Sequence, residues 1–151
     1  MSSAEDFLKT VDRSGFSLEK YVREVPKPWG KELIFTPEDA PYTFKLEYIN
    51  DGAQLSLQVH DNKAETWIMY EGRGKVIVEN SNGELVEVEL ERGKAFTSKV
   101  GQKHRLVGIE NCVIAEASTP ELGTTFRLED DYKRTDETEE VRNSPNRGWN
   151  G

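Results

Sequence analysis

The chain contains two histidines, His60 and His104, and each lies near other side chains that can bind a metal ion. Gln58 and His60 are two residues apart on an expected strand, so their side chains leave the same face of it. Glu65 follows a four-residue turn, and a hairpin at this turn would bring Glu65 beside them. His104 follows a turn between two further expected strands and is placed to reach the same site from across the fold.

Two imidazoles, one carboxylate and one amide oxygen are suitable ligands for a divalent first-row metal ion, and they leave coordination positions open. The sequence therefore predicts one divalent metal ion per chain, held by Gln58, His60, Glu65 and His104. Zn, Fe, Mn, Ni and Co all suit these ligand types, so the identity of the metal stays open. The competing interpretation is that both histidines make ordinary hydrogen bonds inside the core.

Short apolar or alternating runs separated by turn residues recur through the middle of the chain, which is typical of an all-β fold. The expected strands are 31–35, 43–49, 54–60, 65–71, 75–79, 84–91, 94–99, 104–108 and 112–117. Gly, Asn and Asp in the intervening turns accept the backbone angles of tight reversals. This spacing predicts one domain, an antiparallel sandwich or barrel, with the metal ligands on its strands.

The two ends of the chain differ from the middle. Residues 1–25 are expected to form an N-terminal arm with one or two short helical turns, residues 26–134 the barrel, and residues 135–151 a polar tail. The tail is expected to be mostly solvated and could be disordered, with Trp149 its one strong candidate for docking. The arm offers Phe7, Phe16 and Tyr21 to a partner subunit, so we expect a homodimer.

Composition excludes several classes of function. The 151 residues carry 20 basic and 28 acidic side chains, and a net charge of -8 disfavours binding to nucleic acids and anionic lipids. No window approaches the roughly 20 apolar residues that span a bilayer, and the N-terminus lacks the basic and apolar regions of a secretory signal. We therefore expect a cytoplasmic protein without a membrane partner. The single cysteine, Cys112, cannot form an internal disulfide, and its apolar neighbours predict a buried structural role.

Two separate stretches resemble the motifs of the cupin superfamily. In the first, Gln58, His60 and Glu65 lie between Gly52 and Gly72 at the cupin spacing, with Gln in place of the first histidine. In the second, His104 follows Gly93, Lys99 and Gly101 and precedes Gly108, with Lys99 at a position where cupins usually have proline. The resemblance implies an all-β cupin fold, which is a double-stranded β-helix or jelly-roll barrel.

Within the cupins, residues 26–134 are similar to the cupin part of type II mannose-6-phosphate isomerases and their small single-domain relatives. The similar segments are KPWG at 27–30, LSLQVH at 55–60, KAETW at 63–67, KHRL at 103–106 and FRLEDDY at 126–132. The resemblance implies the same metal ligands, Gln58, His60, Glu65 and His104. The isomerases usually have three consecutive histidines, an arginine, and a histidine after the glutamate, where this chain has His60-Asp61-Asn62, Lys63 and Thr66. The sugar, and whether it carries a phosphate, therefore stay open.

Interconversion of an aldose and a ketose needs a base that moves a proton between adjacent carbons. Lys45 and Glu116 are the catalytic candidates, because they are charged residues inside otherwise apolar runs. Lys45 and Glu47 share strand parity and could both face the barrel interior, but the alternation also favours a solvent-facing set of Thr43, Lys45 and Glu47. Glu116 is either a buried functional carboxylate or a residue on an exposed edge.

Four further side chains are candidates for substrate binding: Lys63, Arg105, Arg127 and Trp67. Lys63 keeps a positive charge without the fork of an arginine. Arg105 follows a ligand directly, so strand parity points it away from the metal unless a bulge intervenes. Arg127 has the alternative of an ion pair with the acidic residues 130 and 131. Trp67 is expected to line the cavity, either by packing or as an apolar wall for a sugar ring.

These observations support three functional hypotheses. The first is a metal-dependent isomerase of sugars or sugar phosphates in carbohydrate metabolism, whose partner is a small carbohydrate substrate. The second is a non-catalytic or regulatory cupin that binds a carbohydrate. The third is an iron-dependent oxygenase, which the fourth ligand, Gln58, disfavours because it occupies a position that such chemistry needs.

Overall fold

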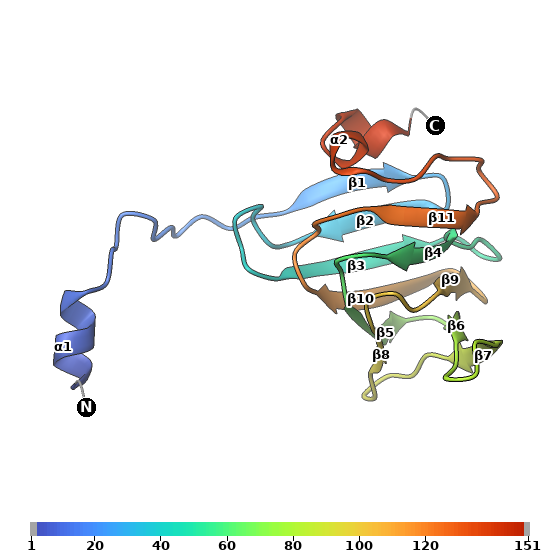
Figure 1. Cartoon of the computed structure of the whole chain (residues 1–151), viewed down its shortest axis with the longest axis horizontal. Helices are drawn as coiled ribbons and strands as arrows, with labels where there is room; N and C mark the ends of the chain where they lie inside the picture. The colour runs from blue at the N-terminus through green and yellow to red at the C-terminus, as the bar shows by residue number, and fades with distance from the viewer. Residues whose placement is uncertain (1–2, 150–151) are drawn as a thin grey trace.

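The computed structural model describes residues 3–149, and their strands form two antiparallel β-sheets that face each other (Figure 1). One sheet has the order β1-β2-β3-β10-β5-β8 and the other β11-β4-β9-β6-β7. The strands of the first sheet are β1 (Arg23–Lys27), β2 (Gly30–Ile34), β3 (Thr43–Ile49), β10 (Cys112–Ser118), β5 (Glu65–Glu71) and β8 (Phe96–Ser98). Those of the second are β11 (Thr125–Glu129), β4 (Leu57–His60), β9 (His104–Gly108), β6 (Gly74–Glu79) and β7 (Leu85–Glu89). The predicted all-β fold is confirmed.

Apolar side chains from both sheets fill one part of the space between them. The buried cluster consists of Trp29, Ile49, Leu55, Trp67, Met69, Val76, Val78, Leu90, Leu106, Cys112 and Ile114. Cys112 is buried, as predicted, and its burial raises the pKa of its thiol to about 11. This cluster supports the strands on which the candidate metal ligands lie.

The interior next to this cluster is charged, and here one prediction is wrong. On β3 the buried residues alternate with more exposed ones, and Thr43, Lys45 and Glu47 belong to the buried set. Phe44 points outward instead and is 42% exposed. The alternation identifies which residues share a face, but it cannot say which face lies inside when the inward charges neutralise one another.

Tight turns connect the strands, and Gly72 shows why glycine is needed in one of them. Its φ is +73°, a region that residues with a Cβ rarely adopt. A Cβ at this position would also lie 2.3 Å from the backbone oxygen of Asn111. Gly72 therefore permits both the turn between β5 and β6 and the close approach of the loop before β10.

The N-terminal arm stands away from the barrel (Figure 1). Helix α1 (Ala4–Lys9) is capped by the side chain of Ser3, and the chain then runs without regular structure to β1. Of the one or two helical turns expected in the arm, α1 forms, and residues 16–22 contain no helix. No helix within residues 3–149 is long and apolar enough to cross a membrane.

The C-terminal tail differs from the expected solvated segment. Residues 139–148 form α2 (Glu139–Arg142) and the 3-10 turn η1 (Pro145–Gly148), which lie beside β1 (Figure 1). Glu137 and Arg147 are only 4% and 8% exposed, and Trp149 is half-buried. The tail folds onto the barrel because its charged residues find partners of opposite charge inside, which composition alone does not reveal.

Candidate metal centre

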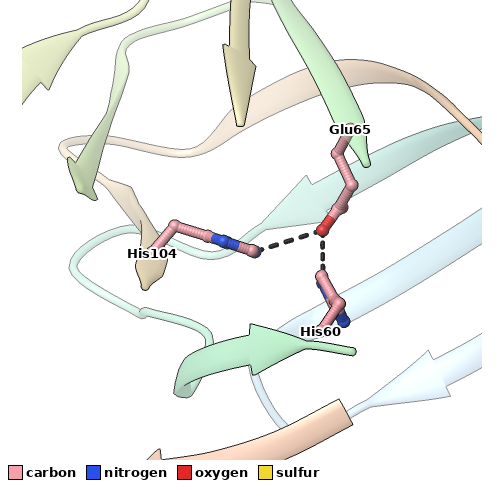
Figure 2. Close-up of side chains that lie close together, drawn as sticks. All are labelled: His60, Glu65 and His104. Atoms are coloured by element: carbon pink, nitrogen blue, oxygen red, sulfur yellow. Dashed lines mark ion pairs between the residues drawn. The ribbon is translucent and has the colours of Figure 1, made fainter. Parts of the chain in front are cut away.

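Three candidate ligands meet at the ends of three strands (Figure 2). His60 is the last residue of β4, Glu65 is the first of β5 and His104 is the first of β9. The Nε2 atoms of both histidines face the same carboxylate oxygen, Oε1 of Glu65, and that of His104 lies 3.1 Å from it. All three side chains are buried, and their potential ligand atoms lie within 4.8 Å of one another.

Hydrogen bonds at Nδ1, the ring nitrogen on the side away from Glu65, orient both imidazoles. Nδ1 of His60 lies 2.9 Å from the hydroxyl of Thr125, and Nδ1 of His104 lies 3.0 Å from the backbone oxygen of Gln102 and 3.2 Å from the hydroxyl of Ser98. A carbonyl oxygen can only accept, so Nδ1 of His104 carries a proton, and Nε2 is the ring atom that faces Glu65. This is the arrangement that positions histidine as a metal ligand.

Gln58 completes the group from β4. Its Nε2 lies 3.4 Å from Nε2 of both His60 and His104, and its Oε1 accepts a hydrogen bond from Ser56 at 2.8 Å. Turning the amide by half a rotation would place the oxygen toward the imidazoles, and the Ser56 hydroxyl could then accept from the amide. Gln58 therefore fits the place of a fourth, oxygen ligand.

The protonation states suit a divalent cation. Burial lowers the pKa of His60 and outweighs the opposing effect of Glu65, which keeps the imidazole neutral. Burial alone would raise the pKa of Glu65, but the Lys63 ammonium and the hydrogen bonds around this carboxylate lower it well below its usual range. Neutral imidazole and ionised carboxylate are the forms that bind metal ions, so the donor set fits a divalent metal.

The catalytic candidates Lys45 and Glu116 lie next to this group. Nζ of Lys45 is 3.5 Å from Oε2 of Glu116 and 2.9 Å from Oε1 of Glu121. Nζ of Lys63 is also 3.5 Å from Oε2 of Glu116, and it lies 3.6 Å from Oε2 of Glu65. Burial, followed by the charge of Glu65, raises the pKa of Glu116. The structure therefore brings Lys45, Lys63 and Glu116 together at the edge of the candidate metal site.

Two substrate-binding candidates also line this cavity, and one does not. Trp67 is fully buried, packs against Phe96 and His104, and donates its indole N–H to Glu116 at 2.9 Å. Arg127 lines the cavity and pairs with Glu137 rather than with the acidic residues 130 and 131. Arg105 lies outside the lining, because its guanidinium donates to the backbone oxygens of Leu55 and Glu129. As strand parity indicated, it points away from the metal ligands.

Sequence reasoning missed much of the charged lining. The missed residues are Lys27, Glu32, Glu121, Arg134, Glu137, Arg142 and Arg147. Glu47 shares strand parity with Lys45, and of the two alternatives for this pair the structure shows the interior one. Nothing in the pattern of the polar tail marks Glu137 or Arg147 as interior residues.

The cavity is nearly full. Its free volume is about 40 Å³, whereas sites for small organic ligands have volumes of roughly 300–1,000 Å³. The charged side chains that line it occupy the remaining space by pairing with one another. A ligand as large as a sugar therefore requires some of the lining to move.

Comparisons with known proteins agree with this geometry. Solved structures with the same fold include an oxalate decarboxylase of Bacillus subtilis, with a TM-score of 0.62 and 18% identity over 78% of this chain and 34% of that chain. The capsular polysaccharide assembling protein CapF of Staphylococcus aureus matches with a TM-score of 0.56 and 15% identity over 87% of this chain and 37% of that chain. At these identities the likeness concerns the fold alone, which is the cupin barrel.

Curated relatives give a closer match in sequence. The chain is 31% identical to the alginate biosynthesis protein AlgA of Pseudomonas aeruginosa, over 86% of this chain and 27% of the relative. It is 26% identical to a mannose-1-phosphate guanylyltransferase of Klebsiella pneumoniae, over 89% of this chain and 28% of the relative. The chain thus spans little more than a quarter of these proteins. The family described as "Mannose-6-phosphate isomerase C-terminal" matches residues 14–137, and the chain belongs to this family of cupin domains.

Proposed function

We propose that this chain is a metal-dependent isomerase that interconverts an aldose and a ketose, either as free sugars or as sugar phosphates. The observation that carries the proposal is the buried group of His60, Glu65 and His104, with Glu116 and Lys45 beside it. The family supports a role in carbohydrate chemistry, since one relative of this chain is named a mannose-1-phosphate guanylyltransferase and another an alginate biosynthesis protein.

In the proposed site, Gln58, His60, Glu65 and His104 would hold one divalent metal ion. A bound ion supplies Lewis acidity, which stabilises negative charge on sugar oxygens during the reaction. These ligand types suit Zn, Fe, Mn, Ni and Co alike, so they do not identify the metal.

Glu116 is the proposed base. Its Oε1 is held by the indole N–H of Trp67, while its buried Oε2 has no hydrogen-bond partner among the described residues. Oε2 would take the proton from the carbon next to the carbonyl, as the electron pair of that C–H bond forms an enediolate double bond. The same oxygen would return the proton to the neighbouring carbon, while the hydroxyl proton passes to the former carbonyl oxygen, so that the carbonyl and the hydroxyl exchange places. Lys45 and Lys63 would hold the carboxylate in place and bind sugar oxygens, and Arg127 would contact the outer part of the substrate.

The test combines metal analysis with isotope exchange. Purified protein should contain about one metal ion per chain, and His60→Ala and His104→Ala should each lose it. Thr66→Ala is the matched control, because Thr66 lies next to Glu65 on β5 but bonds Thr97 instead. Glu116→Gln should keep the metal and lose exchange of substrate C–H for deuterium across a panel of hexoses and hexose phosphates. Unchanged metal content in both histidine variants would exclude the ligand set.

A carbohydrate-binding or regulatory cupin is the second candidate function. Lys63 and Thr66 favour it, because they stand where the isomerases usually have an arginine and a histidine. Saturable sugar binding without any C–H exchange in the metal-loaded protein would support this candidate. An iron-dependent oxygenase would instead consume O2 with its substrate.

We also propose that the chain forms a homodimer through its N-terminal arm. Phe16 and Leu18 are 70% and 102% exposed, and the arm stands away from its own barrel (Figure 1). Apolar side chains on such an arm gain by packing on a second copy. Phe16→Ser with Leu18→Ser should convert a dimer to a monomer in analytical ultracentrifugation, and an unchanged sedimentation coefficient would refute the role of the arm.

A further inference from the structure

The six-stranded sheet has an apolar outer face where its inner face is charged. Lys45 and Glu47 of β3 and Glu116 of β10 point into the barrel and are buried. Successive side chains of a strand leave opposite faces, so the residues between them point outward. In an antiparallel sheet with one solvated face, the polar residues ordinarily lie on that face. In β3 and β10 this order is reversed, and apolar side chains point outward instead.

Cross-strand pairs join the outward side chains into one continuous surface. Leu46 of β3 lies opposite Leu33 of β2 and opposite Ala115 of β10. Ala115 in turn lies opposite Ile68 of β5. The neighbouring rows of the sheet continue this surface with aromatic rings. We define the outer-face patch as the six large side chains Leu33, Phe44, Leu46, Tyr48, Ile68 and Tyr70.

The composition of the outer-face patch differs from that of the chain as a whole. Charged residues make up 32% of the sequence, yet none of the six patch residues is charged. Phe44 and Tyr70 are 42% and 57% exposed, so residues 3–149 leave much of the patch uncovered. Continuous exposed apolar surfaces of this kind mark interaction sites.

The same chain contains an apolar segment that does not pack on its own barrel. Residues 11–22 run between α1 and β1 without regular structure and lead away from the barrel (Figure 1). Phe16, Leu18 and Val22 in this segment are all exposed. Its two basic and two acidic residues leave the segment without net charge, which suits an uncharged patch. Segment and patch therefore match in polarity.

The segment also has the length and the area that the patch requires. Its twelve residues span about 40 Å when extended, whereas the five strand-to-strand spacings of a six-stranded sheet cover about 24 Å. Four of its side chains expose apolar surface: Phe16, Leu18, Tyr21 and Val22. With about 100 Å² on each of them, and an equal area on the patch, two exchanged arms would bury about 1,600 Å². This is the size of a standard protein interface.

We propose that the outer-face patch binds residues 11–22 of a second copy of this chain, and that two copies exchange their arms in this way about a twofold axis. Such an exchange is closed, because each copy both offers an arm and receives one. The inference rests on the dimer proposed above and names the surface that receives the arm. The patch lies on the reverse side of the strands that carry Lys45 and Glu116, so the second copy would support the candidate site from outside.

Analytical ultracentrifugation of the full chain tests the patch by single substitutions. Phe44→Ser and Tyr70→Ser should each raise the dissociation constant of the dimer at least tenfold, because each removes an apolar side chain from the receiving surface. Phe126→Ser is the matched control, since Phe126 is 41% exposed on β11 of the other sheet, and it should leave the constant unchanged. An equal effect in all three variants, or no effect in any, would overturn the proposal.

Comparison with the arm variant separates failure of the patch from failure of the dimer. Phe16→Ser with Leu18→Ser should give monomers, as the patch variants do. If the arm variant is a monomer while both patch variants dimerise as tightly as the wild type, the arm binds another surface and the patch has no role. If the arm variant remains a dimer, the arm itself has no role, and the exchange is refuted with it.

Cross-linking tests the contact in a chain whose patch is unaltered, so it does not depend on how the patch variants fold. A photo-reactive phenylalanine analogue in place of Leu18 should attach on irradiation to peptides of β2, β3, β10 or β5. Mixing this chain with isotope-labelled wild type identifies attachment to a second copy, because such cross-linked peptides carry one labelled and one unlabelled part. Attachment only within one copy, or to strands of the other sheet, would contradict the proposal.

Discussion

Replacement of Lys45 by methionine tests whether the charged interior is a mutually dependent network. The Nζ atom lies 3.3 Å from Glu32, 3.5 Å from Glu116 and 2.9 Å from Glu121, and the side chain is only 4% exposed. Methionine fills a similar volume, so the main effect is to leave buried carboxylates without their shared cation. Loss of one partner from a buried ion pair costs about 3–5 kcal/mol, and we expect Lys45→Met to lower the free energy of unfolding by this amount at neutral pH.

Urea unfolding at several pH values gives the assay and the sign of the effect. Lys45 lowers the pKa of Glu32, Glu116 and Glu121, so these carboxyls bind protons more readily in the variant. The deficit of Lys45→Met against the wild type should therefore shrink as the pH falls, because protonated carboxyls no longer need the ammonium. Lys75→Met is the control, since its pair with Glu87 is exposed and should contribute at most about 1 kcal/mol. An equal loss in both variants would refute the network.

Three further predictions concern other parts of the molecule. The Cε resonance of Lys27 should titrate near pH 8 in NMR, and in Glu137→Gln the midpoint should fall further, because the carboxylate raises this pKa; a midpoint near 10.4 would contradict the burial of Lys27. Thr125→Val should weaken metal binding by about 10–100-fold in a chelator competition, since its hydroxyl orients a proposed ligand, and unchanged affinity would remove that role. Gly72→Ala should destabilise the protein more than Gly52→Ala in thermal unfolding; both have positive φ, but only at Gly72 does a Cβ meet backbone atoms.

The fold and the metal-site residues were predictable because they depend on local spacing. Alternation and turn residues fix strands and reversals. The turn after His60 brings Glu65 beside the histidines as expected, but the expected hairpin is wrong, because β4 and β5 lie in different sheets. His104 adds a ligand from the neighbouring strand β9, whose register with Gln58 puts the two side by side. The ligand set itself remains a prediction until metal is measured.

The orientation of charged strand residues and the position of the tail were not predictable in the same way. Whether Lys45 faces solvent or interior depends on Glu32 and Glu121, which are distant in sequence. Arg147 is inside because of acidic partners on β2 and on the loop before β11. Such long-range neutralisation leaves no periodic signal, so composition alone suggests a solvated tail.

The contribution of the buried charges to folding stability does not by itself explain why they are there. Apolar side chains of similar volume often stabilise a protein as well as buried ion pairs do, or better, because charged groups must be desolvated. The same barrel shows this solution in the cluster around Trp29 and Ile114, where the space between the sheets is filled without charge. At the mouth, the chain instead holds Lys45, Lys63 and Glu116 in contact with one another around a candidate metal centre. A ligand-binding role for the charged part explains this difference between the two parts of the interior, whereas a purely structural role does not.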